Sequence, residues 1–328
     1  MKRRDFIKGA AITTAALTID KLVSPGKADE MKETPSSSNP SRIPRRGYGK
    51  TGIQVSILGF GGIVVARMEQ EHANRVVAEA VERGINYFDV APTYLDAELR
   101  LGPALEPYRK DAFLACKTTQ RKREGAEKEL KRSLERLRTD HFDLYQLHGM
   151  ASVEKDVDVA FGKGGAMEVF IEAKKSGQVR HLGFSAHTVE AASAALDRYD
   201  FDSVLFPINF ACYYKGNFGR QVIERTQSKG VTLLALKSLA RQRWPENDPQ
   251  RTKYMKCWYQ PLTEPHEAEL GFRFTLSQPV TAAVCPGEDE LLRLALDIAE
   301  RFKPVTAQEE AEIKALAATL NPIFVSLA

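Results

Sequence analysis

Short apolar runs alternate with amphipathic stretches along most of the sequence, and this alternation constrains the fold more than any single motif. Most runs are apolar at every position, as parallel strands are when helices cover them and side chains fill the space within. The stretches between them repeat apolar residues with a helical period, as in residues 73–81. The eight runs span residues 55–62, 85–94, 112–119, 142–149, 179–187, 203–210, 232–240 and 281–287.

Eight strands alternating with eight helices predict an α/β fold, a closed (β/α)8 TIM barrel that forms one catalytic domain over residues 47–328. Beyond residues 73–81, the expected helices lie near 126–137, 167–177, 188–199, 218–229, 265–277, 288–302 and 306–320. A doubly wound open sheet also alternates strands with helices, but its dinucleotide-binding form carries GxGxxG after the first strand. The corresponding GFGG at 59–62 lacks the third glycine, so the barrel is preferred.

The distribution of charge argues against a nucleic-acid partner. The 328-residue chain has a formal net charge of +4, but residues 1–46 alone hold ten Lys and Arg against five Asp and Glu. The rest is close to neutral, and it shows no basic stripe that could bind phosphates. The four cysteines are not spaced as CxxC, so we expect no metal site and interpret them as buried apolar residues.

The N-terminal segment is distinct from the predicted barrel. RRDFIK at residues 3–8 resembles the twin-arginine export motif, and residues 9–19 are too short and too weakly apolar for a stable membrane span. We therefore expect a signal peptide at residues 1–28, recognised by the twin-arginine translocation (Tat) machinery, and a periplasmic or cell-envelope location. The alternative is a basic, frayed terminus. Residues 29–46 are rich in Pro, Ser and charge and predict a flexible linker.

Four polar residues stand at or just beyond the ends of three successive runs: Asp89, Tyr94, Lys117 and His148. A helix-like segment follows Tyr94. The carboxyl ends of the strands carry the chemistry in barrels of this kind, so these side chains should meet there. A free tyrosine titrates near pH ~10, and a nearby cation lowers that pKa. Lys117 would be that cation, Asp89 would fix it, and His148 would orient a substrate oxygen. Such a site protonates a carbonyl oxygen while a nicotinamide cofactor supplies hydride.

These residues lie in segments that resemble the aldo-keto reductases over roughly residues 46–300. GKTGIQVSILGFGG is similar to the family's opening hairpin and first strand, and FDVAPTYLDAELRLGPAL is similar to its tyrosine segment. LACKT and LHG resemble its lysine and histidine strands. The resemblance implies that Tyr94 is the general acid of a tetrad with Asp89, Lys117 and His148. It also implies a small carbonyl substrate, with NADP(H) as the usual cofactor and NAD(H) possible.

The cofactor half of the resemblance is less complete. LGFSAH has Ala186 where the family usually has Asn, and Leu205 or its neighbour stands where a Gln is usual. The acids at residues 288–290 have two interpretations. They would repel an adenosine 2′-phosphate, or they are first-turn acids that stabilise the start of a helix through its dipole. Arg293 or Arg241 could still pair with that phosphate. The residues expected to contact the cofactor are Gly61, Ser185, His187, Asn209, Leu236, Ser238, Arg241, Gly287 and Arg293.

Residues 241–265 have no clear period and contain two tryptophans, so we interpret them as a lid or substrate wall; the alternative is an insertion that only shields the barrel. The leading hypothesis is an exported, NAD(P)H-dependent carbonyl reductase. The departures at Ala186 and Leu205 leave open a cofactor-binding sensor with little turnover. A barrel hydrolase is a weaker alternative because it needs two catalytic carboxylates and the strand ends offer one.

Overall fold

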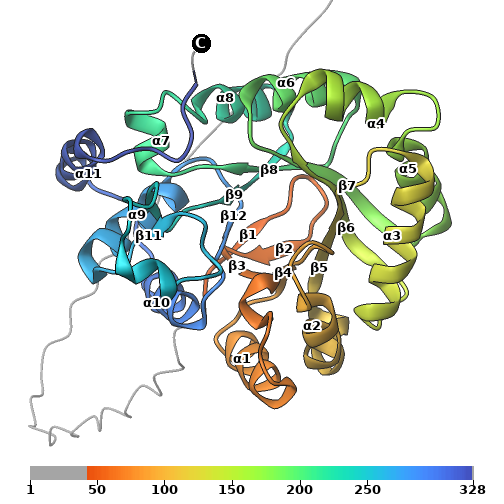
Figure 1. The fold of residues 1–328 in the computed structure, drawn as a ribbon, viewed down its shortest axis with the longest axis horizontal. Coiled ribbons are helices and arrows are strands. Elements are labelled where there is room, and N and C mark those ends of the chain that lie inside the picture. The colour runs from red at the N-terminus through yellow and green to blue at the C-terminus, as the bar shows by residue number, and fades with distance from the viewer. Residues whose placement is uncertain (1–42, 327–328) are drawn as a thin grey trace, which may run out of the picture. The chain divides into compact units, whose positions relative to one another are not determined.

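The computed structural model describes residues 43–326, drawn in colour in Figure 1. The expected export signal at residues 1–28 and nearly all of the linker at 29–46 lie outside this range. Among the described residues, no helix has both the length and the apolar character needed to cross a bilayer.

Eight parallel strands close into a barrel, in the order β12-β3-β4-β5-β6-β7-β8-β9. The strands are β3 (Leu58–Gly61), β4 (Tyr87–Asp89), β5 (Phe113–Thr118), β6 (Phe142–Met150), β7 (Val179–Ala186), β8 (Ser203–Pro207), β9 (Thr232–Leu236) and β12 (Ala282–Val284). Each strand falls within or next to one of the eight predicted apolar runs, which confirms the predicted (β/α)8 fold. Most strands are shorter than the runs because the last residues of several runs turn into the loops that carry polar side chains.

Helices surround the barrel (Figure 1). They are α1 (Gln70–Glu82), α2 (Ala97–Leu105), α3 (Arg123–Arg136), α4 (Val159–Phe161), α5 (Ala166–Ser176), α6 (Val189–Arg198), α7 (Phe210–Tyr214), α8 (Arg220–Lys229), α9 (Pro265–Ser277), α10 (Asp289–Glu300) and α11 (Ala307–Thr319). The apolar stripe predicted from residues 73–81 is the buried face of α1, where Ala73, Val76, Val77 and Ala80 pack inward. The short helices α4 and α7 were not predicted, since a single turn shows no period.

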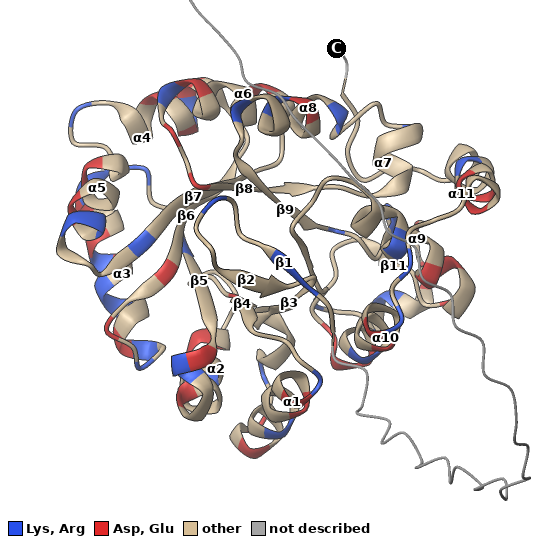
Figure 2. Cartoon of the chain, turned by 180° about the vertical axis from the view of Figure 1, so that it is seen from behind, with Lys and Arg blue, Asp and Glu red and all other residues tan. Residues whose placement is uncertain are grey.

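An antiparallel hairpin closes the amino end of the barrel. It consists of β1 (Arg45–Gly47) and β2 (Gln54–Ser56), and Figure 2 shows it lying across the barrel from behind. The buried Tyr48 between the two strands donates a hydrogen bond to Ser203 Oγ at 2.8 Å and packs against Phe113 with ring centroids 4.8 Å apart. Both partners are first residues of barrel strands, so the hairpin blocks that end and leaves the opposite end for a site.

The first predicted run, residues 55–62, proves to be two strands rather than one. Ser56 ends β2 and Leu58 starts β3. The Ser56 hydroxyl donates to Leu58 O at 2.7 Å, and the Ser56 amide donates to Asn86 Oδ1 at 2.7 Å. These bonds redirect the backbone from the hairpin into the barrel wall.

The segment predicted as a lid or wall is ordered and packed. It contains the antiparallel pair β10 (Ala240–Gln242) and β11 (Gln260–Pro261) and a 3-10 turn, η4 (Pro249–Thr252). Trp244 Nε1 donates to Cys257 O at 2.9 Å, which ties the two arms of the segment together. Within the segment, the side chains of Tyr254, Cys257 and Tyr259 are buried, whereas that of Trp258 is half exposed.

Candidate active site

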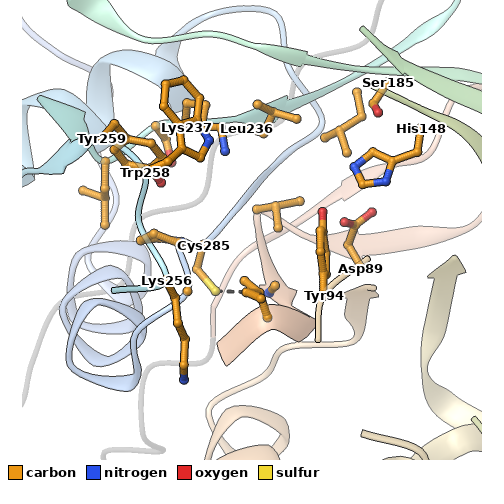
Figure 3. A pocket seen from close by; sticks show the side chains of 18 of the residues that line it. Asp89, Tyr94, His148, Ser185, Leu236, Lys237, Lys256, Trp258, Tyr259 and Cys285 are labelled. Carbon is orange, nitrogen blue, oxygen red and sulfur yellow. Dashed lines mark hydrogen bonds between the residues drawn. The ribbon is translucent and has the colours of Figure 1, made fainter. Parts of the chain in front are cut away.

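A cavity of about 270 Å³ lies at the carboxyl ends of the strands, and all four residues predicted for catalysis line it. Figure 3 labels three of them, Asp89, Tyr94 and His148. Asp89 is the last residue of β4, Tyr94 stands in the loop after that strand, and Lys117 and His148 come from β5 and β6. Parallel strands of a closed barrel end at the same rim, so residues distant in sequence converge there. The remaining wall comes from the exits of β3, β7, β9 and β12, from Leu205 of β8 and from the segment before α9.

Asp89 pairs with Lys117, and both side chains are almost fully buried. Lys117 Nζ also donates to Val90 O at 3.2 Å. The second oxygen of Asp89 accepts hydrogen bonds from Gln146 Nε2 at 3.1 Å and Tyr87 OH at 3.3 Å. Burial alone would lower the pKa of Lys117, but the adjacent carboxylate outweighs it and the pKa is raised. The lysine is therefore a fixed, permanent cation at neutral pH.

Tyr94 is held beside that cation. Lys117 Nζ donates to Tyr94 OH at 3.4 Å and lies 5.0 Å from the centre of the phenol ring. The expectation that Lys117 lowers the pKa of Tyr94 below its ordinary value is wrong in net effect. Burial raises this pKa, and the opposing influence of Lys117 offsets only part of the rise. Tyr94 is therefore protonated at neutral pH, which is the form a proton donor needs, and Lys117 is placed to stabilise the phenolate that donation creates.

His148 faces Tyr94 edge to face, with ring centroids 5.7 Å apart and an interplanar angle of 86°. Its Nδ1 lies 3.4 Å from Thr93 Oγ1. Burial, followed by the positive charge of Lys117, holds the pKa of His148 well below its ordinary value. The imidazole is therefore neutral at physiological pH and can offer a hydrogen bond to a substrate oxygen without adding charge.

The wall opposite Tyr94 is formed partly by the segment interpreted as a lid or substrate wall and partly by Lys237, which was not singled out from the sequence. Lys237 follows β9, and Lys256, Trp258 and Tyr259 belong to the segment before α9 (Figure 3). Lys237 Nζ lies 5.3 Å from the Trp258 ring centre and 5.0 Å from that of Tyr259. Lys237 could have been suspected because it is a lone charge in the apolar run LLALKSLA. The absent period and the two tryptophans of residues 241–265 predicted a lid or wall, but nothing local shows which of its side chains face the cavity.

Comparison with known proteins agrees with this geometry. The profile of the Aldo/keto reductase family matches residues 57–317. The chain belongs to the aldo/keto reductase family. It is 26% identical to an uncharacterized oxidoreductase of Bacillus subtilis, YqkF, over 83% of this chain and 95% of the relative. It is 28% identical to L-galactose dehydrogenase of Arabidopsis thaliana over 61% of this chain and 66% of that protein.

A solved structure supports the same assignment. The holo form of the Bacillus halodurans aldo-keto reductase AKR11C1 superposes with a TM-score of 0.67 and 25% identity, covering 87% of this chain and all of that one. The protein is thus an oxidoreductase of the aldo/keto reductase type, and membership of this family implies a nicotinamide cofactor.

Six of the nine residues expected to contact the cofactor line the cavity of this aldo/keto reductase: Gly61, Ser185, His187, Leu236, Ser238 and Gly287. Ser185 Oγ accepts a hydrogen bond from the Gly149 amide at 2.7 Å, which leaves its proton free to donate. The two glycines stand where the wall is tight. A Cβ at Gly61 would meet Cys285 O at 2.6 Å, and one at Gly287 would meet Lys256 Cβ at 2.6 Å.

The other three do not line the cavity, and their contact with the cofactor stays a prediction. Asn209 is buried and fastens the loop after β9: its Nδ2 donates to Lys237 O at 3.2 Å and to Ala240 O at 2.9 Å. Arg241 pairs with Glu267 on α9 at 2.7 Å. Arg293 pairs on the outer surface with Glu79 at 3.2 Å and with Asp289 at 3.5 Å. Both arginines are thus paired with nearby carboxylates in this structure.

The cavity wall suits a nicotinamide ring and its carboxamide. Leu205, Leu236 and Val284 give it an apolar surface. Ser185 offers a hydroxyl, and the Ser238 hydroxyl is buried with no hydrogen-bond partner among residues 43–326. Orphaned buried polar atoms are uncommon and often mark the place of a ligand. The donors, the apolar wall and the adjacent tyrosine therefore fit this group.

Proposed function

We propose that this chain reduces an aldehyde or ketone, or oxidises the corresponding alcohol, with a nicotinamide dinucleotide. One observation carries the proposal: Lys117 joins Asp89 to Tyr94 in the cavity that neutral His148 also lines. The cavity is large enough for a small carbonyl compound beside a nicotinamide ring. A bound reduced nicotinamide supplies the hydride to the carbonyl carbon.

The residues of the chain manage the proton and the developing charge. His148 orients the carbonyl oxygen toward Tyr94, whose raised pKa keeps its proton available. As negative charge develops on the oxygen, Tyr94 OH transfers its proton to that oxygen. Lys117 then stabilises the phenolate, and its bond to Asp89 prevents it from drifting toward the substrate. The buried, fixed dipoles around Lys117 need no reorganisation during the reaction.

Charge favours NADH over the family default, NADPH. The resemblance places an adenosine 2′-phosphate near the start of α10, where Glu288, Asp289 and Glu290 are clustered. The two arginines considered as phosphate partners, Arg241 and Arg293, already form ion pairs with carboxylates. NADPH would have to draw one of them away, whereas NADH requires no such change. Titration of both dinucleotides against the purified protein tests this preference.

Replacement of Tyr94 by Phe tests the proposed function. Loss of the general acid should lower kcat by about 100- to 10,000-fold, while dinucleotide affinity stays within a few-fold. Tyr199→Phe is the matched control, because it removes a phenol hydroxyl from a partly buried tyrosine that does not line the cavity. Carbonyl turnover that survives Tyr94→Phe within a few-fold would overturn the tetrad assignment.

The substrate panel should cover aldehydes, ketones and, in the oxidative direction, sugars, since one relative is an L-galactose dehydrogenase. Tight dinucleotide binding without turnover across this panel would favour the alternative of a sensor protein. We further propose export through the twin-arginine route, supported by RRDFIK at residues 3–8. Replacing Arg3 and Arg4 by Lys should retain the protein in the cytoplasm on cell fractionation.

Export would separate the protein from the soluble dinucleotide pool of the cytoplasm. A protein exported in the folded state could carry its dinucleotide with it if release is slow. We expect the protein isolated from the periplasm to contain bound dinucleotide, identified by mass and absorbance. Isolation as an apoprotein that rebinds dinucleotide only weakly would contradict slow release.

A further inference from the structure

His148 can assist the proposed reaction in only one of its two neutral forms. A carbonyl oxygen accepts hydrogen bonds and donates none, so His148 has to present a ring N–H to it. A neutral imidazole carries one ring proton, on Nδ1 or on Nε2, and its other nitrogen presents a lone pair. If the wrong nitrogen of His148 is protonated, its lone pair repels the oxygen that Tyr94 is to protonate.

The two ring nitrogens of His148 have different surroundings. Nδ1 lies 3.4 Å from the hydroxyl oxygen of Thr93. Nε2 forms no hydrogen bond with any group of residues 43–326. His148 lines the cavity, and Figure 3 shows its ring pointing toward Tyr94. Nε2 is therefore the nitrogen that is open to a substrate, whereas the protein supplies the partner of Nδ1.

The charges of the cavity do not favour the productive form of His148. After burial, the causes that lower the pKa of His148 include the positive charges of Lys117 and Lys237, and both lysines line the cavity. A cation on the cavity side of a neutral imidazole favours a lone pair there over a proton. The cavity alone would therefore draw the proton away from Nε2, and a group on the other side of the ring has to oppose this bias.

Thr93 is held beside the His148 ring by the turn that carries Tyr94. The Tyr94 amide donates to Ala91 O at 3.0 Å, and the Ala97 amide donates to Tyr94 O at 3.0 Å. These bonds fix the backbone on both sides of the threonine. Thr93 does not line the cavity, so it can influence the reaction only through another residue.

The backbone of His148 is held independently of Thr93. Arg121 Nη2 donates to His148 O at 2.7 Å. The next amide along the chain, that of Gly149, donates to Ser185 Oγ at 2.7 Å. Loss of the Thr93 hydroxyl should therefore change the state of the ring and leave the loop after β6 in place.

We propose that Thr93 is a positioning residue whose hydroxyl donates to His148 Nδ1 and thereby keeps the ring proton on Nε2. The inference rests on the proposed function and adds the group that sets the tautomer of His148. The Nε2–H then donates to one lone pair of the carbonyl oxygen, while Tyr94 protonates the other. A Thr93 hydroxyl that accepts a bond from Nδ1–H instead is the opposite arrangement, and the test distinguishes the two.

The test compares Thr93→Val, which has nearly the same shape as the parent residue but no hydroxyl, with Thr93→Ser, which keeps the hydroxyl. Thr319→Val is the matched control, because this threonine is exposed at the end of α11 and its hydroxyl donates to Leu316 O at 2.8 Å. Nuclear magnetic resonance of protein with isotope-labelled histidine reports the tautomer, from the couplings between each ring nitrogen and the carbon-bound ring protons. The signals of His148 are those that disappear in His148→Gln.

We expect Nε2 to carry the proton in the parent, in Thr93→Ser and in Thr319→Val, and a measurable share of the Nδ1-protonated form in Thr93→Val. The kcat for carbonyl reduction should fall about 2- to 12-fold in Thr93→Val, as expected for the loss of one neutral hydrogen bond, and should recover in Thr93→Ser. Dinucleotide affinity and the midpoint of urea unfolding should match those of the parent in all three variants.

Two results would overturn the proposal. One is a parent in which Nδ1 of His148 carries the proton. The other is a tautomer that Thr93→Val leaves unchanged, whatever happens to kcat. The tautomer is measured without cofactor or turnover, so failure of the proposed reductase activity would be seen separately, in the assays of Tyr94→Phe and of the substrate panel.

Discussion

Replacement of Asp89 by Asn isolates the electrostatic contribution of the buried pair to stability. The side chains of Lys117 and Asp89 are only 1% and 2% exposed. Asn has the same shape as Asp, so the change leaves no cavity, and its oxygen can still accept bonds from Gln146 and Tyr87. What disappears is the charge opposite Lys117, whose remaining neighbours are the neutral Val90 carbonyl and the Tyr94 hydroxyl.

The loss of unfolding free energy caused by Asp89→Asn can be calculated in two ways. Breaking a buried ion pair by removing one partner costs about 3–5 kcal/mol. The folded variant can also escape the unpaired charge by releasing the Lys117 proton. An ordinary lysine has a pKa of ~10.4, so pH 7 lies roughly 3.4 units below it, and deprotonation costs about 1.36 kcal/mol per unit. The resulting ceiling of about 4.6 kcal/mol agrees with the first value.

The second route makes the destabilisation depend on pH. When the pKa of Lys117 is depressed in the folded variant, the unfolded chain binds more protons, and the free energy of unfolding rises with pH. At pH 9 the ceiling falls to about 1.9 kcal/mol. In the parent the pKa of Lys117 is raised. In the parent, the contribution of charged Lys117 to stability is therefore fully present at any pH below the pKa that this lysine has in the unfolded chain. It is lost only as the pH rises through the higher pKa of the folded protein, which lies above the range pH 7–9.

Urea unfolding followed by circular dichroism at pH 7, 8 and 9 measures these differences. Adding Lys117→Met to Asp89→Asn removes the unpaired charge and should recover part of the lost stability. Glu124→Gln is the control: it breaks the ion pair with Lys128, which is highly exposed, and should leave the unfolding midpoint unchanged. A loss below about 1 kcal/mol at pH 7, or a loss that does not shrink by pH 9, would refute the reasoning.

Three further predictions concern the walls of the site. Asn209→Ala should lower the free energy of unfolding by about 1–3 kcal/mol, measured by urea unfolding, because the Ala240 carbonyl loses its Asn209 donor and the Lys237 carbonyl keeps only the Ala240 amide. His148 should stay neutral in nuclear magnetic resonance titrations across pH 6–8, and a midpoint near 6.5 would contradict its desolvation. Gly61→Ala should cost about 1–3 kcal/mol in thermal or urea unfolding, since its Cβ would collide with Cys285 O.

The fold and the convergence of the four predicted catalytic residues were accessible from the sequence because both follow from local patterns and one general rule. Apolar runs in parallel strands mark themselves by composition, and their carboxyl ends must share one rim once the barrel closes. Tyr94, Lys117 and His148 end or nearly end such runs and Asp89 lies within one, so their convergence could be predicted without knowing any distance.

The tertiary structure decided what depends on packing between distant segments. Whether burial or Lys117 dominates the pKa of Tyr94 is a balance between desolvation and charge, and only the buried geometry fixes it. The motif predicts that Arg241 contacts a cofactor, and only the fold shows that Glu267 on a later helix pairs with it. The surroundings of Lys237 could not be predicted, because the loop at residues 241–265, which has no sequence period, packs the rings of Trp258 and Tyr259 against its ammonium. Local sequence specifies which elements form, but the free energy of a charge depends on every group that the fold brings around it.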